Sequence, residues 1–528
     1  MNLMNFNYIK SLLPAIAFTL SLSSCVGDLD VDPTIDKSTS MKFERDAVFA
    51  KIYANMALTG QQGPAGNQDI ADIDEGTSDF SRQLWNMNEL PTDEAICSWA
   101  DAGIPEYNFA TWDASHGMVT CLYYRLYFGI TMANYFLAET EAQTSDATVA
   151  MQRAEARFLR ALYYYYAMDL FGNIPFLTTI SSENAPQAKR SEIFKFIEDE
   201  LLGTDETKGC IDDMADPKSN TYGRADKATA WVLLSRLYLN SEIYTGTAQW
   251  AKAAEYAKKA MDSAYELCPT YSLLFMGDNN VNGAQDEVLL PILQDGIDTQ
   301  NYGGSLFLIA STHKDDMGST GTSENWAGNR ARKELIDKFF PTSKAPNTDV
   351  AGMIAAAQDD RAMFYGKDRK LEIEEPTAFT EGFSCAKFSN LYANGNSPRD
   401  VKFVDMDVPF IRLAEAYLTY AEAQTHLGNN DEAKDAIDAL RDRANNPNKQ
   451  PSYTLDDICD EWAREFAFEG RRRMDLIRFG KFGGNSNYTW EWKGGVKAGT
   501  NFSANKNVYG IPTNDLVSNS NLKQNPGY

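Results

Sequence analysis

Two stretches of this sequence carry alanines at the spacing with which neighbouring helices pack against each other. In the first, residues 224–264, an apolar helix predicted at 228–239 is followed by an alanine-rich partner at 250–261. The second stretch, residues 411–444, repeats the plan around a Leu-Gly-Asn-Asn turn. Small residues at crossing points let two antiparallel helices approach closely, so this pattern restricts the chain to a fold built from packed helix pairs.

The turn lengths and alanine spacings of both pairs are typical of tetratricopeptide repeats, which stack helix pairs into a scaffold. A further helix is predicted from about 149 to 171, where one apolar stripe recurs at spacings of three and four residues. Gly172 and Pro175 predict the end of that helix. A generic helical bundle is the alternative that the pattern leaves open.

Four other tracts have weak periodicity and are rich in glycine, asparagine, aspartate and aromatic residues: 60–118, 270–330, 340–410 and 484–528. We interpret them as irregular insertions with only short strands, such as 287–293. The predicted fold class is therefore all-α, a tetratricopeptide-like helical-repeat scaffold with long loop-rich insertions and little sheet. The repeat pairs are expected near 149–264 and 411–480, within a single domain that spans residues 41–528.

The N-terminus has the features of a lipoprotein signal peptide at residues 1–24. Lys10 precedes an apolar run at 12–22 that is too short to span a bilayer, and small residues stand directly before Cys25. The mature chain is expected to begin at a lipidated Cys25, whose acyl chains anchor it to a membrane, and to continue as an acidic tether to residue 40. An unprocessed apolar N-terminus is the alternative.

The net charge narrows the class of expected partners, and the cysteine spacing narrows the kinds of metal and redox site. The formal net charge of −25 repels phosphate backbones, so nucleic acid is not an expected partner. The seven cysteines include no Cys-x-x-Cys pair, which argues against a zinc or thioredoxin-like site. Apart from Cys25 we interpret most of them as small buried apolar residues, and a disulfide or two is the alternative outside the cytoplasm.

Motifs for catalysis are missing from the sequence. The three histidines do not form a His-Glu-x-x-His motif, no Gly-x-Ser-x-Gly elbow occurs, and the Gly-Gly pairs lack the strand and helix of a phosphate loop. A carboxylate pair for glycoside hydrolysis has no distinctive signal among 74 acidic residues. The arginine-rich stretch 469–478 is predicted to continue the helix that contains Trp462, with structural ion pairs rather than anion binding as its role.

Aromatic residues in the irregular tracts are the main signal for binding. They are Trp85, Trp99, Trp112, Tyr302, Trp326, Trp490 and Trp492. The C–H face of a sugar stacks on an aromatic ring, while its hydroxyls pair with planar polar groups, so rings grouped on loops favour a glycan site. For any single tryptophan, burial in the core is the alternative.

Oxygen-rich loops raise the question of a hard cation. Asp405 and Asp407 stand just before a predicted helix, and Asp278 and Asn280 lie in a turn-rich loop. Carboxylate and amide oxygens are ligands for calcium, although neither stretch matches an EF-hand. A structural calcium site is therefore one interpretation, and solvated loop carboxylates with a helix cap are the other.

Several short blocks together resemble the SusD/RagB family along essentially the whole chain. They are the sequence before Cys25, Asn88–Glu94, Glu155–Tyr164 followed by Asp169–Pro175, Gly223–Lys227, Asn301–Ser305, Glu461–Phe466, Asp475–Gly480, Trp492–Gly495, Ile511–Pro512 and Gln524–Tyr528. They occur in the family's order. Each block is short, but the combination is highly specific.

This resemblance implies an outer-membrane lipoprotein of Bacteroidetes, exposed on the cell surface, that binds glycan without cleaving it and requires no cofactor. It also implies a place as a lid on a SusC-like TonB-dependent transporter, with a helical scaffold and a loop-rich half that carries the sugar site. The aspartates at 28, 30 and 32 resemble the surface-export signal of such lipoproteins.

The resemblance extends to a starch-binding member of the family, and that member's site residues can be carried over by position. Arg82, Tyr302 and Trp326 match an arginine, a tyrosine and a tryptophan that contact α-glucan in that member. Cys97 stands where that member has a stacking tryptophan, so Trp99 is expected to take over stacking or to fill the core.

Two further positions complete the carry-over from that member. Ala102 replaces an asparagine that hydrogen-bonds the sugar. Asp405 and Asp407 align with an acidic pair near a calcium site, and Asp278 and Asn280 fall in its companion loop, which is one residue shorter here.

Two other functions are compatible with the sequence. One is a repeat adaptor or lid that contacts the transporter through its tetratricopeptide pairs and has no sugar site of its own. The other is a glycoside hydrolase with an unrecognised carboxylate pair. Glycan binding is the leading hypothesis, with starch or another α-glucan as the suspected ligand.

Overall fold

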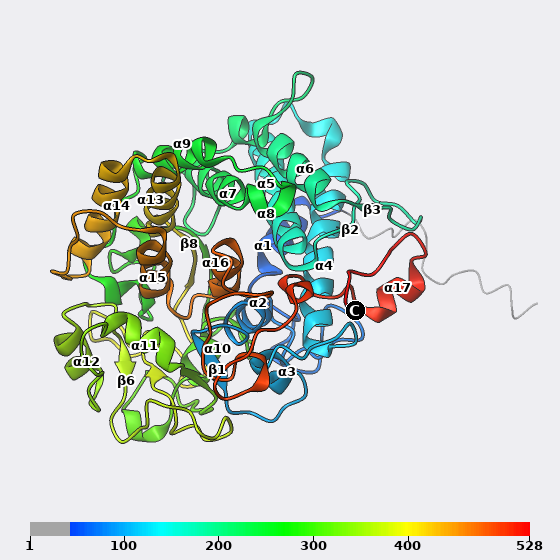
Figure 1. Ribbon diagram of the computed structural model, residues 1–528. Coiled ribbons are helices and arrows are strands. Elements are labelled where there is room, and N and C mark those ends of the chain that lie inside the picture. Colours follow the sequence, from blue (N-terminus) through cyan, green and yellow to red (C-terminus); the bar gives the residue numbers. More distant parts are fainter. Residues whose placement is uncertain (1–42) are drawn as a thin grey trace, which may run out of the picture. The chain divides into compact units, whose positions relative to one another are not determined.

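Helices form most of the frame in the computed structural model, which describes residues 43–528 (Figure 1). The helices are α1 Arg45–Ala54, α2 Phe80–Glu89, α3 Ile104–Asn108, α4 Gly117–Glu139, α5 Ala147–Phe171, α6 Arg190–Leu202, α7 Lys227–Leu239, α8 Ser241–Thr245, α9 Trp250–Met261, α10 Gly304–Ala310, α11 Lys333–Phe339, α12 Val350–Ala357, α13 Ala414–Leu427, α14 Asn430–Arg443, α15 Leu455–Phe466, α16 Arg472–Arg478 and α17 Thr513–Ser518.

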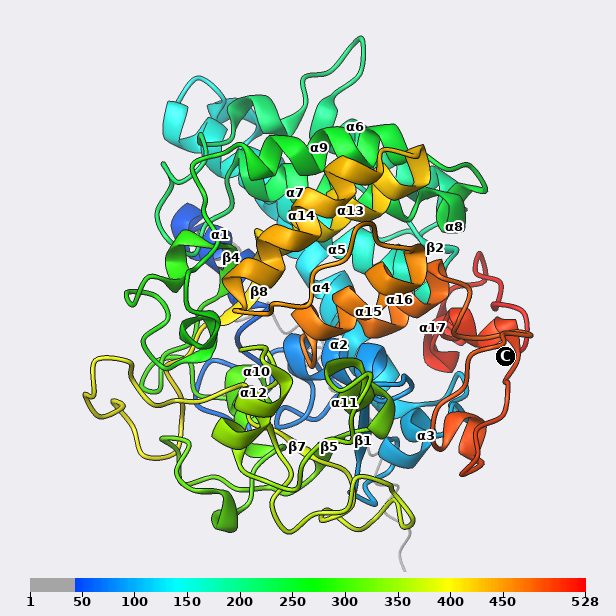
Figure 2. The same cartoon turned by 60° about the vertical axis from the view of Figure 1, so that its left-hand side comes forward.

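The two predicted helix pairs are present. Helix α7 packs on α9, with the short α8 between them in sequence, and α13 packs on α14. Helix α9 also packs on α13, so the two pairs join into one layer, and Figure 2 shows α7, α9, α13 and α14 in neighbouring rows. Gly428 caps α13 with a φ of 82°, the left-handed conformation that lets the chain reverse into α14.

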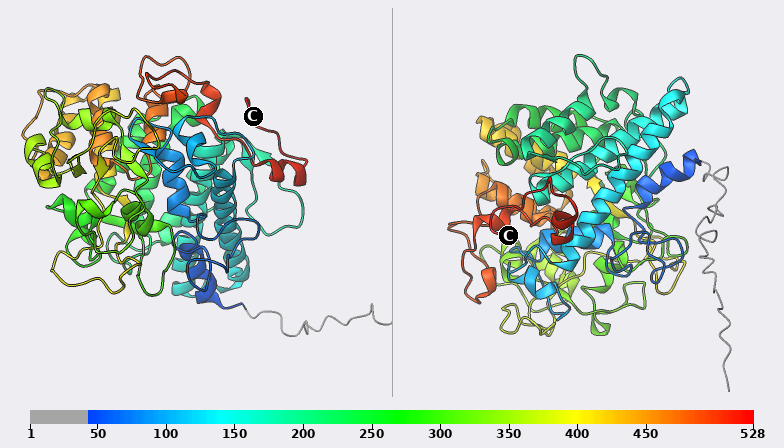
Figure 3. Two further views of the ribbon diagram at one scale, coloured as in Figure 1. Left: turned by 90° about the horizontal axis from the view of Figure 1, so that it is seen from below. Right: turned by 90° about the vertical axis from the view of Figure 1, so that its right-hand side faces the viewer.

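Helix α5 lies at the centre of the helical frame. It packs against α4 and α6, and both views of Figure 3 show the long α4 and α5 side by side. Asp146 caps its N-terminus by accepting from Thr148 N and Val149 N, and Gly172 ends it with a φ of 71°. Its residues from Ala154 to Phe171 are nearly all buried, as expected for a helix surrounded by other helices.

Sheet is limited to four antiparallel two-stranded pairs within the described residues. The pairs are β1 Ala95–Cys97 with β5 Asn329–Ala331, β2 Ile174–Pro175 with β3 Gln187–Ala188, β4 Val288–Ile292 with β8 Val408–Arg412, and β6 Phe364–Tyr365 with β7 Ser384–Cys385. The predicted strand at 287–293 is thus confirmed as β4, and the expectation of little sheet is confirmed as well.

The loop-rich tracts surround the shorter helices. In Figure 2 the segments between α10 and β7 lie below the rows of long helices, together with β1 and α3. Seven short 3₁₀ turns also occur in the described chain, at Glu141–Gln143, Cys210–Asp213, Tyr271–Phe275, Ala284–Asp286, Asp315–Met317, Lys493–Gly495 and Ala504–Asn507. Residues Arg45–Tyr528 make up one unit by their internal contacts.

Two local predictions were wrong. The arginine-rich stretch does not continue the helix of Trp462, because α15 ends at Phe466 and Phe468 has a φ of 63°. Two buried carboxylates stabilise this break: Glu94 accepts from Phe468 N, and Glu89 accepts from Gly470 N at 2.7 Å. The acidic pair at 405–407 precedes strand β8 rather than a helix, because Val408–Arg412 pairs with β4.

The arginines of that stretch form structural ion pairs, as predicted. Arg472 lies 2.7 Å from Asp93, and Arg473 lies 3.0 Å from Asp169. All four of these side chains are buried, so each guanidinium is paired where water does not reach it. The pairs connect α16 to the segment after α2 and to α5.

The cysteines behave as small apolar residues. Six of them, Cys97, Cys121, Cys210, Cys268, Cys385 and Cys459, are buried free thiols, and no disulfide joins any of the residues from 43 onward. Cys25, the signal peptide and the tether lie outside the described residues. Within residues 43–528, no helix combines the length and apolar character needed to cross a membrane.

Candidate functional site

Four of the predicted site residues meet in the structure. The rings of Trp99 and Trp326 have centroids 6.4 Å apart at 55°, and those of Tyr302 and Trp326 are 6.4 Å apart at 59°. The Arg82 guanidinium lies 6.0 Å from the centroids of both tryptophans. All four side chains are half-buried. We call Arg82, Trp99, Tyr302 and Trp326 the aromatic platform.

Strand pairing brings the two tryptophans together. Strand β1 pairs with β5 so that Cys97 is opposite Asn329, and Ser98 N donates to Gly328 O at 2.9 Å just beyond. Trp99 therefore emerges beside Trp326, and its Nε1 donates to Trp326 O at 3.0 Å. A Cβ on Gly328 would lie 2.3 Å from the Trp99 indole, so this close approach requires glycine.

Asp79 positions the other two members. It is the N-cap of α2, where its Oδ1 accepts from Arg82 N at 2.8 Å, and the same oxygen accepts from Gly304 N at 2.9 Å. One carboxylate thus joins the start of the helix that carries Arg82 to the start of α10, next to Tyr302. Burial raises the pKa of Asp79, against the lowering effect of these two N–H donors.

Arg82 is held so that part of its guanidinium remains free. Nη1 donates to Gly76 O at 3.2 Å and to Tyr302 O at 3.1 Å. Burial lowers the pKa of Arg82, with Asp79 as the largest opposing charge. Nε is buried without a partner, and Nη2 makes no hydrogen bond to any described residue. The N–H groups of Nη2, unlike the buried Nε, suit a ligand that offers hydroxyl acceptors.

The residues that depart from the family pattern differ in exposure. Cys97 is buried in β1, where its backbone exchanges hydrogen bonds with Asn108 at 3.0 and 2.8 Å, and burial raises the pKa of its thiol to about 12. Ala102 is exposed. Trp99 stands at the platform rather than in the core. A tryptophan therefore lies beside Trp326 even though position 97 is a cysteine.

Polar residues that the sequence did not indicate also touch the platform. Lys402 Nζ donates to the Tyr302 hydroxyl at 3.2 Å, and Glu324 Oε2 accepts from Trp326 Nε1 at 2.7 Å. Phe307 lies under Arg82, 5.1 Å from its guanidinium. Lys402 is far from the platform in sequence, so only tertiary structure identifies it, whereas Glu324 stands two residues before Trp326.

The remaining tryptophans of the loop tracts are mostly structural. Trp85, Trp112 and Trp490 are buried, with exposed fractions of 3%, 1% and 1%. Trp492 is half-buried and donates to Ile373 O at 2.9 Å. For the three buried rings the alternative of a core role is confirmed.

The residues expected at a calcium site have other partners. Asp405 Oδ1 accepts from Arg399 Nε at 2.8 Å and from Gly296 N at 3.0 Å, and its Oδ2 accepts from Tyr392 OH at 2.9 Å. Asp278 accepts from Ala393 N and from Asn394 N.

The other two members of that set, Asn280 and Asp407, lie in different surroundings. Asn280 is exposed, while its neighbour Asn279 is buried and donates to Asp407 O. Burial raises the pKa of Asp407 to about 7. No group of three histidine, cysteine, aspartate or glutamate side chains within residues 43–528 could hold a metal ion. As arranged, the carboxylates of Asp278, Asp405 and Asp407 do not fit calcium, because N–H and O–H donors and the Arg399 guanidinium already occupy their oxygens.

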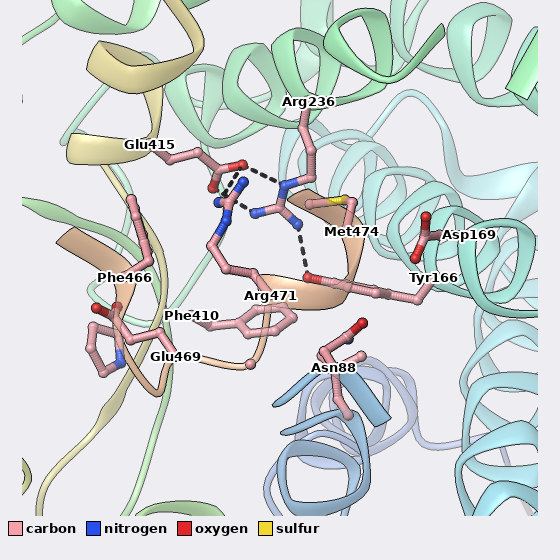
Figure 4. Close-up of a pocket in the computed structure, with 13 residues that line it drawn as sticks. Asn88, Tyr166, Asp169, Arg236, Phe410, Glu415, Phe466, Glu469, Arg471 and Met474 are labelled. Atoms are coloured by element: carbon pink, nitrogen blue, oxygen red, sulfur yellow. Dashed lines mark hydrogen bonds and ion pairs between the residues drawn. The ribbon is translucent and has the colours of Figure 1, made fainter. Parts of the chain in front are cut away.

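A polar cavity in the core is too small for a glycan. It measures about 40 Å³, and Figure 4 shows Arg236 between Glu415 and the Tyr166 hydroxyl at its edge. The Arg236 Nε–Glu415 Oε1 and Arg236 Nη1–Tyr166 OH distances are 2.6 and 2.8 Å. A space of this size holds a few water molecules, whereas small-molecule sites begin near 300 Å³. This cavity belongs to the internal ion-pair network.

A groove of about 730 Å³ lies between α11, α12 and α15. Its phenylalanines Phe339 and Phe340 are buried, and its Lys338 is paired with Asp460 at 2.9 Å. Its third aromatic residue, Tyr488, is half-buried, and its hydroxyl accepts from Lys338 Nζ at 3.1 Å. The groove therefore offers no exposed ring face among its phenylalanines. The aromatic platform is the better candidate for stacking on a sugar.

Two family models match parts of this chain. The model of the "SusD family" matches residues 356–528, and a second one, described as "Starch-binding associating with outer membrane", matches residues 29–239. Among curated proteins, the chain is 41% identical to Starch-binding protein SusD from Bacteroides thetaiotaomicron, over 99% of this chain and 100% of that protein. It is 26% identical to SusD-like protein P2 from Formosa agariphila, over 80% and 83% of the two chains.

Solved structures share the fold. Surface glycan-binding protein A from Bacteroides uniformis has a TM-score of 0.68 at 20% identity, covering 91% of this chain and 98% of its own. A laminarin binding SusD-like protein has a TM-score of 0.66 at 22% identity, covering 92% and 99%. The predicted all-α, tetratricopeptide-like scaffold with little sheet is thereby confirmed.

Proposed function

This chain belongs to the SusD family, and on that premise we propose that it captures an oligo- or polysaccharide without cleaving it, with starch or another α-glucan as the ligand. The observation that carries the proposal is the platform, where three half-buried rings and a partly free guanidinium converge from four separate segments. The 41% identity to a starch-binding protein supports an α-glucan in particular.

The platform suits sugars for physical reasons. Sugar rings present apolar C–H faces that stack on Trp99, Tyr302 and Trp326, and the Nη2 N–H groups of Arg82 donate to hydroxyl oxygens. Neighbouring rings are tilted by 55° and 59°, so successive sugars meet surfaces that turn with the chain. A helical α-glucan turns in this way, whereas a flat ribbon does not.

A tryptophan replacement tests the site. Trp326→Ala removes the central ring and should lower the affinity for maltoheptaose at least tenfold in isothermal titration calorimetry. Trp250→Ala is the matched control, because Trp250 is also half-buried but stacks on His426 on the helical side, 4.0 Å between centroids. Full binding by Trp326→Ala would contradict this site assignment.

Delivery of the glycan to a SusC-like TonB-dependent transporter is the second part of the proposal. It is supported by the family described as associating with the outer membrane. In this scheme the lipid on Cys25 anchors the chain at the cell surface. Cys25→Ser should release the protein from the membrane fraction, and pull-down of the anchored protein should bring the transporter with it. A variant that stays in the membrane fraction would contradict the anchor.

A lid or adaptor without its own sugar site is the second candidate function. The packed pairs α7–α9 and α13–α14 favour it, because helix pairs of this kind commonly bind proteins. Co-purification with a transporter, together with no binding to any glycan in affinity electrophoresis, would support the adaptor. Release of reducing sugar from starch by the purified chain would instead overturn the non-catalytic part of the proposal.

A further inference from the structure

Lys402 and Glu324 connect the polar edges of two platform rings. Lys402 Nζ lies 3.2 Å from the Tyr302 hydroxyl and 3.6 Å from Glu324 Oε1. Glu324 Oε2 in turn accepts from Trp326 Nε1 at 2.7 Å. We call the Lys402–Glu324 pair the bracket, because an unbroken chain of polar contacts runs from Tyr302 through the bracket to Trp326.

The two loops that carry the bracket are fixed to each other. Ser323 N donates to Val401 O at 2.7 Å, and Thr322 Oγ1 donates to Lys402 O at 2.6 Å. Both bonds lie within two residues of the bracket side chains. The backbone therefore holds Lys402 and Glu324 in place before any ligand arrives.

The bracket also controls the surroundings of Tyr302. Lys402 Nζ lies 4.9 Å from the centroid of the Tyr302 ring, which packs on Phe403 with centroids 6.0 Å apart. The Tyr302 hydroxyl and the Trp326 N–H are thus engaged by protein groups. What these two residues offer a ligand is their ring faces, at a relative angle of 59°.

We propose that the bracket is a positioning element, with Lys402 and Glu324 holding Tyr302 and Trp326 at the angle that selects curved over flat glucans. This inference rests on the proposed function of the platform. The bracket acts through the rings and need not touch the sugar. Ion pairs with this much exposure contribute little to folding, so its loss should change glycan selectivity rather than stability.

Lys402→Met and Glu324→Gln test the inference with maltoheptaose as the curved glucan and cellohexaose as the flat one. Each variant should bind maltoheptaose about three- to tenfold more weakly, and its preference over cellohexaose should shrink. The double variant should lose no more than the worse single variant, because the two residues act as one unit. Lys402→Arg should keep most of the preference.

Lys252→Met is the matched control. Lys252 on α9 has the same local chemistry, because its Nζ lies 2.9 Å from Glu198 Oε1 and 4.8 Å from the Tyr238 ring centroid. This variant should bind both glucans like the wild type. The melting temperatures of all variants should stay close to that of the wild type.

The possible outcomes distinguish a failure of the bracket from a failure of the proposed glycan site. If Trp326→Ala loses binding while both bracket variants keep the affinity and the preference of the wild type, the bracket role is overturned and the platform stands. If the wild type binds neither glucan, or Trp326→Ala binds normally, the proposed site fails and the bracket fails with it.

Discussion

Trp99 and Cys97 are two residues apart but have different environments. Cys97 is 1% exposed within β1, whereas the Trp99 ring is half-buried and faces Trp326. Trp99→Ala should therefore weaken maltoheptaose binding about three- to tenfold by removing one stacking face, with calorimetry as the measurement. Unchanged affinity would indicate that Trp99 only supports Trp326.

Much of the platform could be predicted from the sequence, because Arg82, Tyr302 and Trp326 match family positions. The place of Trp99 could not be settled, since the choice between core and platform depends on β1–β5 pairing and on the space left by Gly328. Lys402 could not be found, because its contact with Tyr302 joins residues 100 positions apart. Sequence patterns report local spacing, and these contacts are not local.

The ion pairs of Arg399 lead to a prediction about the effect of calcium on stability. The Arg399 guanidinium lies 2.8 Å from Asp405 and 2.7 Å from Asp295, where it supplies positive charge that a calcium ion would otherwise bring. Removing calcium with EGTA should therefore leave the melting temperature unchanged within about 1 °C, measured by differential scanning fluorimetry. A clear rise on adding calcium back, with magnesium as control, would show that a cation displaces Arg399.

At the scale of elements, helices with an apolar stripe were predictable and helices without one were not. The stripe of α5 and the alanines of α7, α9, α13 and α14 gave their bounds to within a few residues. Helix α2 was missed because its buried residues include Gln83, Asn86, Asn88 and Glu89, which give no apolar pattern. Of these four, Glu89 has hydrogen-bond partners far along the chain, at Gly470 and Arg471.

The break between α15 and α16 depends on such a partner. Glu89 Oε1 accepts from Gly470 N and Arg471 N at 2.7 and 2.9 Å across more than 380 residues, while its Oε2 is buried and has no hydrogen-bond donor in the described chain. Burial raises the pKa of Glu89 from 4.5 to about 7 and that of neighbouring Glu94 well above its ordinary value. We interpret this as a carboxyl pair that shares a proton.

Glu89 makes a pH-dependent contribution to stability. Because its pKa is raised on folding, this contribution is full below pH 4.5 and is lost as the pH rises through about 7. Glu89→Gln keeps the acceptor and imitates the protonated form. The variant should match the wild type near pH 4 and exceed its free energy of unfolding by roughly 2–3 kcal/mol at pH 8, measured by urea denaturation. Parallel pH curves for the two proteins would contradict this.

At the scale of the whole molecule, a buried ion-pair network joins the helical scaffold to segments of the loop-rich tracts. Glu465 on α15 lies 2.7 Å from Arg412 on β8 and also pairs with Arg443 on α14, and Glu287 before β4 pairs with the same two arginines. Exposure of these side chains is between 0% and 3%. The helical scaffold and a strand of the loop-rich tract are therefore coupled through one set of charges.

Loss of one carboxylate should destabilise the entire unit Arg45–Tyr528. Glu465→Gln leaves Arg412 and Arg443 short of a negative charge where water cannot compensate, so the free energy of unfolding should fall by about 3–5 kcal/mol in urea denaturation. Arg443 and Arg412 lower the pKa of Glu465, so its contribution is present above pH 4.5 and is lost as the pH falls below that value. The wild type should thus lose stability in acid faster than Glu465→Gln.

Glu255→Gln is the control: it removes an exposed pair with Lys259 on α9 and should change neither the free energy of unfolding nor its pH dependence. If Glu465→Gln unfolds like the wild type at both pH 4 and pH 7, the network does not couple the two parts of the fold.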